Sequence, residues 1–217
     1  MPITANKNQN DLNQRAQYQK KGIGRRFWDV MNNTIIEQAK TRLGPTEKDW
    51  QGKCVLDAGC AEGILSDVVL QQLPGIDLTS MDIDPINVQI CRDHNLPAIQ
   101  GDLYQIPFDD NTFDLAFLIA VIEHLEQPEK ALGELSRVLK PGGSLIVVYP
   151  VDWAWFLARM ACFYWREAFF NYGHLRQWTF RSLAASLKRN GMELDYKKAS
   201  PFCFPFQLIG IAAATKK

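Results

Sequence analysis

Apolar positions along the chain alternate between short continuous runs and longer repeats. The continuous runs predict buried strands at residues 54–56, 78–83, 97–100, 113–119 and 144–149. The repeats, in which apolar side chains recur every three or four positions, predict helices at 64–73, from 85 to about 95, and from 128 up to Pro141-Gly142-Gly143. Strands that alternate with helices in this way favour a parallel sheet covered by helices on both faces.

Helical repeats also flank this central region. Residues 23–43 form an amphipathic pattern that ends near Gly44-Pro45, and we expect this helix to pack against the domain and to border a substrate pocket. Near the other end, Thr179 is expected to cap a helix over 180–189. Strands are predicted near 192–198 and 207–215. Residues 1–22 are polar and rich in Asn and Gln, so we expect a flexible segment there.

Length and composition narrow the class of protein. A chain of 217 residues is long enough for one domain over 23–217 with a sizeable core. Lys plus Arg (24) equals Asp plus Glu (24), so no net charge steers the chain toward nucleic acid or an anionic membrane. Five cysteines without a CxxC pair argue against a disulfide framework, and no signal-peptide core or bilayer-length apolar run is present, so we expect a cytoplasmic protein.

Candidate binding residues follow the ends of the predicted strands. In parallel sheets ligands bind beyond the carboxyl ends of the strands, near the point where the strand order reverses. The positions there are 57–63, Asp82, Asp102 and 119–124. The aspartates among them can accept hydrogen bonds from ribose hydroxyls or an amino group. Each aspartate alone is more often a helix cap or a turn residue, but three at matching strand ends favour a ligand site.

Seven segments occur in the order typical of one enzyme family: Val55–Gly63 (VLDAGCAEG), Met81–Pro85 (MDIDP), Gly101–Leu103 (GDL), Ile106–Phe108 (IPF), Phe113–Leu115 (FDL), Val121–Leu125 (VIEHL) and Arg137–Gly143 (RVLKPGG). As a set they resemble class I S-adenosylmethionine-dependent methyltransferases of the small-molecule type. The resemblance covers roughly residues 50 to 150. It implies a Rossmann-like, doubly wound α/β fold with a seven-stranded, mostly parallel sheet and an antiparallel last strand. The segment after strand five is expected to add a helical cap.

The resemblance also implies the cofactor and its residues. Gly59, Ala61 and Gly63 would line the methionine part of S-adenosylmethionine, with Asp57 shaping the loop. Backbone around Ile119 and the following residue would face the methionine tail. Glycine has no Cβ, so it allows a tight turn and a close approach to a ligand. Ala61 is a departure, because the family commonly has glycine at this position.

The adenosine part of the cofactor is expected beside the next two strands. Asp82 would accept hydrogen bonds from both ribose hydroxyls. Asp102 would meet the adenine amino group, with the base held between Ile83 and Leu103.

The nearest rival is an oxidoreductase that binds a dinucleotide. Its G-x-G-x-x-G fingerprint is not met, because Ala61 stands at the second glycine position and Ile64 at the third. Glu62 lies inside the loop, no Lys or Arg accompanies it there, and its charge would repel a pyrophosphate. An acidic loop instead suits a ligand with a sulfonium and an ammonium group. The same argument counts against a P-loop nucleotide enzyme.

Residues 151–178 are unusually rich in aromatic side chains and are expected to form the cap. Rings such as Trp153 and Trp155 either hold the cap against the domain or line an apolar acceptor pocket, and 151–172 is also a candidate for contact with a lipid surface. Charged residues interrupt the segment, so it is not expected to span a membrane.

Two histidines are candidate catalytic bases. Methylation of an oxygen requires loss of its proton, and histidine has a suitable pKa. His124 and His174 are the candidates, while His94 is expected within a helix far from the strand ends. The alternative for either candidate is a hydrogen bond that fixes its loop. Some methyltransferases bind a divalent metal through E-x-x-E-H, but Ala120 replaces the first glutamate here, so we predict no metal site.

The sequence therefore predicts a methyltransferase that transfers a methyl group from S-adenosylmethionine to a small-molecule acceptor, most simply at oxygen of an apolar or aromatic compound. The alternative is a non-catalytic methyltransferase-like module that binds a ligand or a partner protein. The sequence leaves the acceptor and the oligomeric state open.

Overall fold

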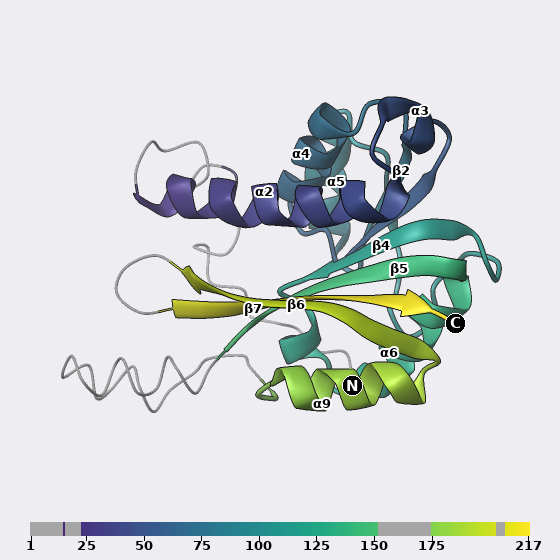
Figure 1. Ribbon diagram of the computed structural model, residues 1–217. Coiled ribbons are helices and arrows are strands. Elements are labelled where there is room, and N and C mark those ends of the chain that lie inside the picture. Colours follow the sequence, from purple (N-terminus) through teal and green to yellow (C-terminus); the bar gives the residue numbers. More distant parts are fainter. Residues whose placement is uncertain (1–14, 16–22, 152–174, 203–206) are drawn as a thin grey trace.

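Seven strands form one sheet in the computed structural model, which describes residue 15 and residues 23–151, 175–202 and 207–217 (Figure 1). The strands are β1 (Cys54–Ala58), β2 (Asp77–Asp82), β3 (Ala98–Gln100), β4 (Phe113–Ile119), β5 (Leu139–Pro150), β6 (Met192–Phe202) and β7 (Gln207–Lys216). Their order across the sheet is β3-β2-β1-β4-β5-β7-β6. Strand β7 is antiparallel to β5 and β6, whereas the pairs from β3 to β5 are parallel. The predicted mostly parallel sheet with an antiparallel last strand is confirmed.

The strand order reverses between β1 and β4. From β1 the chain moves outward through β2 to β3, and it then returns to place β4 on the other side of β1. Asp57 near the end of β1 is level with Phe117 of β4, and Ala58 is level with Met81 of β2. The carboxyl ends of these strands therefore meet at one edge of the sheet, the carboxyl edge, where ligands bind in folds of this kind.

Helices cover both faces of the sheet (Figure 1). The helical elements are α2 (Ile23–Leu43), α3 (Glu47–Trp50), α4 (Ile64–Gln72), α5 (Pro85–Asp93), η2 (Ile122–His124), α6 (Pro128–Val138) and α9 (Phe180–Arg189). Alternate strand residues point to opposite faces, so Val55 packs in the cluster with α2 and α4, while Leu56 packs with α6 and α9. No helix in the described part of the chain is long and apolar enough to cross a membrane.

Several predicted helix boundaries are confirmed in detail. Helix α2 covers the predicted residues 23–43. The Asp84 carboxylate accepts a hydrogen bond from the Ile86 amide at 2.9 Å, and Pro85 is the first residue of α5. The Thr179 hydroxyl accepts from the Ser182 amide at 3.1 Å at the start of α9. Capping residues therefore fix where α5 and α9 begin.

The boundary between α6 and β5 differs from the prediction. The helix ends at Val138 instead of continuing to Pro141, and β5 begins at Leu139, which pairs with Phe113. Proline disfavours helical backbone at the residue before it, so the chain is already extended ahead of Pro141. Gly142 then takes a positive φ of 78°.

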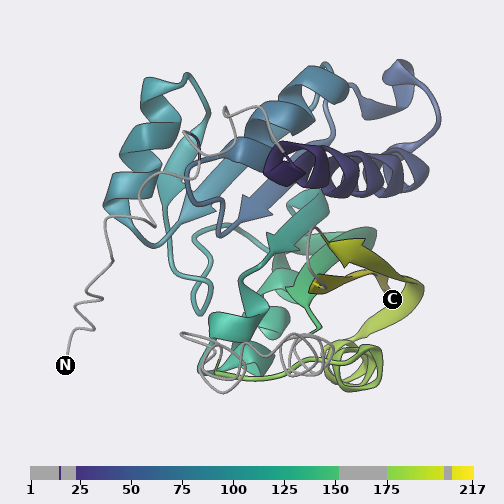
Figure 2. The ribbon, with the colours of Figure 1, turned by 90° about the vertical axis from the view of Figure 1, so that its left-hand side faces the viewer.

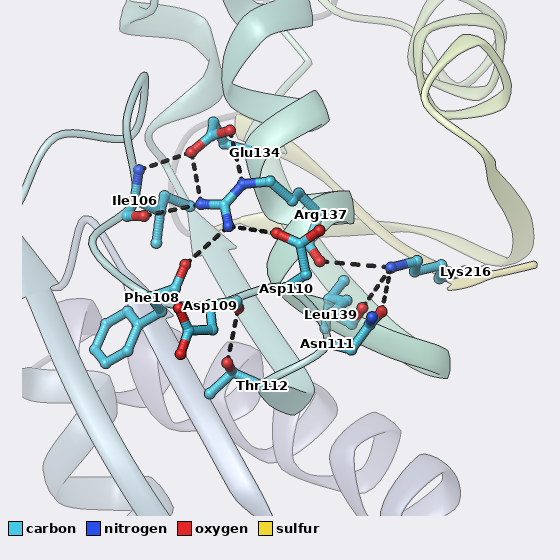
Figure 3. Close-up of polar contacts among 10 residues, drawn as sticks. All are labelled: Ile106, Phe108, Asp109, Asp110, Asn111, Thr112, Glu134, Arg137, Leu139 and Lys216. Carbon is cyan, nitrogen blue, oxygen red and sulfur yellow. Dashed lines mark hydrogen bonds and ion pairs between the residues drawn. The ribbon is translucent and has the colours of Figure 1, made fainter.

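Arg137, the penultimate residue of α6, joins the loop before β4 to that helix (Figure 3). Its guanidinium donates two hydrogen bonds to Glu134, at 3.0 and 2.9 Å, and one to Asp110 at 2.8 Å. Two more go to the backbone oxygens of Phe108 and Ile106, at 2.8 and 2.9 Å. A guanidinium has five N–H donors, and all five have acceptors here.

Further cations surround the amino ends of β4 and β5, which we call the amino edge. Lys216 donates to the Leu139 carbonyl at 2.6 Å and to the Asn111 side chain at 2.8 Å (Figure 3). Asp114 lies 2.7 Å from Lys140. Burial tends to raise the pKa of Asp114, but hydrogen bonds led by that from Lys140 leave the pKa below its ordinary value. The amino edge is thus a set of matched charges.

Candidate active site at the carboxyl edge

Four buried carboxylates gather where β1, β2 and β4 end (Figure 2 views the sheet from this side). Asp57, Glu62, Asp82 and Glu123 are between 2% and 8% exposed, and they are the buried carboxylates of the described residues. A buried charge is costly unless it is paired or hydrogen-bonded. Such a concentration at one edge of the sheet therefore marks a candidate functional site.

The loop over residues 59–63 turns through three positive φ angles. Gly59 has φ 79°, Ala61 has φ 47° and Gly63 has φ 74°. The amides of Gly59 and Cys60 both donate to the Met81 carbonyl, at 2.7 and 3.0 Å, so the loop is tied to the end of β2. A Cβ at Gly59 would lie 2.6 Å from a Val121 methyl carbon, which excludes larger residues there. At Ala61 the left-handed backbone costs about 1 kcal/mol.

Among the described residues, the hydrogen-bond donors to Asp82, at the end of β2, are all neutral. Its Oδ2 accepts from the Ala61 amide at 2.8 Å, and its Oδ1 accepts from the Asp84 amide at 2.9 Å and from Asn87 Nδ2 at 3.2 Å. A carboxylate has about four acceptor positions, so Oδ2 retains capacity for a further donor. The structure thus brings together Asp82 and the 59–63 loop, as predicted.

Asp57 lies deeper, at the end of a hydrogen-bond chain. The Ser66 hydroxyl of α4 donates to it at 2.6 Å and lies 2.8 Å from the Ser80 hydroxyl of β2. Burial raises the pKa of Asp57 to about 6, although the Ser66 hydrogen bond opposes this shift, and the negative charge of Asp82 adds to it. Asp57 therefore ties β1 to α4 and β2 beneath the loop.

Asp102 and its neighbours form the exposed flank of this edge. The Asp102 carboxylate accepts from the amide two residues later, at 2.8 Å, and the preceding Gly101 donates to the Asp82 carbonyl at 3.0 Å. Ile83 is 66% exposed, which is unusual for an aliphatic side chain, and Leu103 is half-buried. The exposed side chain of Ile83 thus belongs to the residue after Asp82, and the Gly101 hydrogen bond brings the turn that carries Asp102 close to it.

The end of β4 carries a second strained alanine. Ile119 is half-buried, and Ala120 has φ 54° while its amide donates to the Val148 carbonyl at 2.8 Å. Ala61 and Ala120 thus both take left-handed backbone beyond adjacent strands. Strain of this kind clusters at functional sites.

His124 follows this strand, in η2. Its side chain is 48% exposed, and its Nε2 lies 4.0 Å from Oε1 of the buried Glu123. The Glu123 carbonyl accepts from the Leu175 amide at 2.9 Å. His174 and residues 152–173 lie outside the described residues, and His94 is the C-cap of α5, not an internal helix residue.

Arg15 corrects one expectation about the loop. Its backbone amide donates to the Glu62 carboxylate at 2.8 Å, and its guanidinium donates to the carbonyls of Glu62 and Gly63. The guanidinium also pairs with Asp67 at 2.6 Å. The expectation that no cation accompanies Glu62 is therefore wrong. No local signal indicated it, because the two residues are 47 positions apart and Arg15 stands in a polar segment.

Sequence reasoning also missed two buried amides. Asn87, three residues after the Asp84 cap, is buried and donates to Asp82. The sequence signal for this contact was a polar residue on the inner face of a predicted helix. Asn32 of α2 is 2% exposed, and its side-chain nitrogen has no hydrogen-bond partner among the described residues.

Two further features bear on the predicted site. In the described parts of the chain, no group of three or more His, Cys, Asp or Glu side chains is arranged to hold a metal ion. An open hollow of about 510 Å³ runs along the loop before β4, and its lining contains none of the predicted cofactor residues: Gln105, Ile106, Pro107, Phe108, Asp109 and Thr112.

Comparison with known proteins agrees with this geometry. Residues 56–147 match a family model described as "Methyltransferase domain". The chain is 36% identical over 110 residues to malonyl-[acyl-carrier protein] O-methyltransferase from Herminiimonas arsenicoxydans, a match that covers 51% of this chain and 42% of that protein. It is 30% identical over 135 residues to a mitochondrial ubiquinone biosynthesis O-methyltransferase from Schizosaccharomyces pombe, covering 57% of this chain and 47% of the relative.

The chain thus spans less than half the length of these two relatives. Among solved structures, magnesium protoporphyrin IX methyltransferase from Synechocystis PCC 6803 with bound SAH superposes with a TM-score of 0.71 at 16% identity. That match covers 94% of this chain and 92% of the other. At this identity the likeness shows a shared fold.

Proposed function

We propose that this chain, which carries a class I S-adenosylmethionine-dependent methyltransferase domain, transfers a methyl group from S-adenosylmethionine to an oxygen of a small apolar or aromatic acceptor. The observation that carries the proposal is Asp82. Its carboxylate is fixed against the 59–63 loop by the Ala61 amide, yet it retains an acceptor position for a ligand hydroxyl. The names of both relatives specify O-methyltransferases, which supports oxygen as the methylated atom.

The carboxyl edge offers suitable groups for each part of the cofactor. When bound, S-adenosylmethionine supplies an electrophilic methyl carbon attached to a sulfonium. Asp82 accepts hydrogen bonds from the ribose hydroxyls, and Asp102 accepts one from the adenine amino group. Ile83 and Leu103 cover the faces of the base, a role that suits the exposure of Ile83.

The methionine part is held by backbone. The turn at Gly59, Ala61 and Gly63 faces it from β1, and the peptide groups of Ile119 and Ala120 face it from β4. The positive φ angles of this loop bring backbone close to the ligand, which a Cβ at the glycines would prevent. Arg15 donates its amide to the Glu62 carboxylate and a guanidinium hydrogen bond to the Glu62 carbonyl, so we rest the preference for a cationic ligand on Asp57 and Asp82 rather than on Glu62.

Transfer to oxygen requires a base, and we assign this role to His124 or His174. The imidazole of His124 is half-exposed, so it is accessible to an acceptor, and it lies beside the buried Glu123. Substituting each histidine with alanine tests the assignment, with His94→Ala as control. Unchanged turnover in both variants would remove the proposed base.

Residues 151–172 are proposed to provide the apolar surface that recognises the acceptor or a lipid interface. The variants Trp153→Ala and Trp155→Ala test this idea. Weaker binding of apolar acceptors or of lipid vesicles is the expected result, and unchanged binding of both contradicts it.

A reducing compartment such as the cytoplasm suits the described thiols, since Cys54, Cys60 and Cys91 are all free. The balanced charge of the chain is consistent with a small-molecule acceptor rather than nucleic acid.

Calorimetric titration with S-adenosylmethionine, followed by transfer of labelled methyl groups to extracts and purified products, tests the whole proposal. Binding together with transfer supports an enzyme. Binding without transfer to any acceptor supports the alternative, a module that binds the cofactor and serves as a partner protein. Absence of binding excludes the proposed cofactor site.

A further inference from the structure

We propose that Cys60 and Cys91 are a site of oxidative modification whose disulfide weakens binding of S-adenosylmethionine; the effect on binding rests on the proposed function. The two sulfur atoms lie 3.9 Å apart, and both side chains are buried. Cys60 is in the 59–63 loop, while Cys91 is near the end of α5. The pair thus connects the candidate cofactor loop to a helix.

The sulfur of Cys91 lies directly beneath the loop. It is 3.3 Å from the Ala61 carbonyl, and a Cβ at Gly63 would lie 2.8 Å from it. A disulfide has an S–S distance of about 2.05 Å, so the sulfurs must approach by nearly 2 Å. Cys91 is fixed in a regular helix, whereas Cys60 lies between Gly59 and Ala61, both with positive φ. The movement therefore falls on the loop.

The surroundings of the two thiols shift their pKa values in opposite directions. The pKa of Cys91 is lowered, first by the hydrogen bond from Cys60 and also by the charge of Arg15, against the opposing effect of burial. The pKa of Cys60 is raised, because the same hydrogen bond and burial keep its proton on sulfur. Cys91 is thus the better nucleophile of the two.

A peroxide is a suitable oxidant. The Cys91 thiolate attacks one oxygen of hydrogen peroxide, the O–O bond breaks, and a sulfenic acid and one water form once the leaving hydroxide takes up a proton. The Cys60 sulfur then attacks the sulfenic sulfur, the S–O bond breaks, and a second water leaves with the thiol proton. In total, two thiols lose two electrons and two protons to one peroxide, giving one disulfide and two waters.

The loop's contacts explain why the disulfide affects binding. The amide of Cys60 donates to the Met81 carbonyl, and the next amide, of Ala61, donates to Asp82 at 2.8 Å. Pulling Cys60 toward α5 disturbs both hydrogen bonds. Asp82 and the loop then lose the alignment that the ribose and the methionine part require.

The test uses the full chain with Cys162→Ser and Cys203→Ser, so that these two thiols cannot pair with the site. Hydrogen peroxide is added, and the product is followed by intact mass, by mapping of linked peptides and by calorimetry with S-adenosylmethionine. We expect a loss of about 2 Da from one disulfide, a link between Cys60 and Cys91, and a Kd at least tenfold higher. Dithiothreitol should restore the reduced Kd.

Two further variants serve as controls. Cys91→Ser should form no link and should keep its Kd after peroxide treatment. Cys54→Ser removes a described thiol whose sulfur lies near the Gly52 carbonyl, away from the pair, and should respond as the parent does.

Failure has distinguishable forms. Reduced protein that binds S-adenosylmethionine but forms no link, or forms the link with an unchanged Kd, overturns this inference. Reduced protein that does not bind S-adenosylmethionine overturns the proposed function and the effect on binding, while peptide mapping still decides whether the thiols pair.

Discussion

The two edges of the sheet handle negative charge in opposite ways. At the amino edge, Asp110 and Glu134 share Arg137, and Asp114 pairs with Lys140, so each of these three carboxylates has a cation. At the carboxyl edge, Asp57 and Asp82 are more deeply buried, and among the described residues their hydrogen-bond partners are hydroxyl and amide groups.

The difference separates stability from binding. A matched cation stabilises the fold but leaves little negative potential for a ligand. Carboxylates held by neutral donors keep a negative potential that can attract a ligand, but burying their unpaired charge lowers the free energy of unfolding. Substitutions of charged residues at the amino edge should therefore lower stability without changing cofactor affinity. Neutralising a carboxylate at the carboxyl edge should instead weaken cofactor binding or relieve the cost of a buried charge.

The largest expected effect is at Arg137. Arg137→Met leaves two backbone carbonyls and two carboxylates without their donor, so we expect a loss of about 3 to 4 kcal/mol in the free energy of unfolding. Urea denaturation measures this, and the Kd for S-adenosylmethionine should not change. Arg189→Met is the matched control, since that ion pair on α9 is exposed to solvent and should contribute far less to stability. Equal losses in both variants would contradict the special role of Arg137.

The cost of burying the charge of Asp57 should appear in the pH dependence of the free energy of unfolding. Its pKa rises from 3.8 to about 6 on folding, so below pH 4 it is protonated in both the folded and unfolded states and destabilises neither. As the pH rises from 4 to 6, Asp57 ionises in the unfolded state but stays protonated in the folded state, so the stability of the wild type falls. Relative to wild type, Asp57→Asn should thus gain about 2 to 3 kcal/mol over this range and no more above pH 7.

Denaturation at a series of pH values measures that gain. The exposed Asp109→Asn variant of the amino edge is the control and should show no such trend. A difference between Asp57→Asn and wild type that is constant from pH 4 to 7 would rule out a raised pKa at Asp57.

Local patterns account for what the sequence predicted well. Helix α2, strand β4 and the caps at Asp84 and Thr179 each depend on residues within a few positions, so periodicity and cap chemistry were sufficient. The strand-end aspartates were found for the same reason, since each directly follows an apolar run.

Distant contacts account for what the sequence did not predict. Arg15 reaches Glu62 across 47 positions, and Arg137 binds the backbone oxygens of Ile106 and Phe108, which no side-chain pattern reveals. The early end of α6 depends on strand pairing between Leu139 and Phe113 of β4, in addition to the local effect of Pro141.

Asp82 provides the direct test of the binding edge. Asp82→Asn removes the charge but keeps an oxygen for the Ala61 amide, so we expect the Kd for S-adenosylmethionine to rise roughly 30-fold, about 2 kcal/mol. Asp77→Asn, at the exposed amino end of the same strand, is the matched control for calorimetry. Equal Kd values in both variants would mean that the carboxyl edge does not bind the cofactor through Asp82.

The smallest effect tests whether the loop beyond β1 holds strained backbone. Ala61 has φ 47°, where a Cβ costs about 1 kcal/mol, while glycine costs somewhat less than that in extra chain entropy. Ala61→Gly should therefore stabilise the fold by roughly 0.5 kcal/mol. The freer loop should bind S-adenosylmethionine no more tightly than wild type.

The control for this substitution is Ala58→Gly, three residues earlier within β1, where the backbone is extended and the methyl group is buried. Glycine there should destabilise by about 1 kcal/mol, because it gains flexibility and relieves no strain. Opposite signs for two identical substitutions so close in the chain would show that the loop, and not the strand that carries it, holds strained backbone for the ligand. Destabilisation in both variants would mean that Ala61 is not strained.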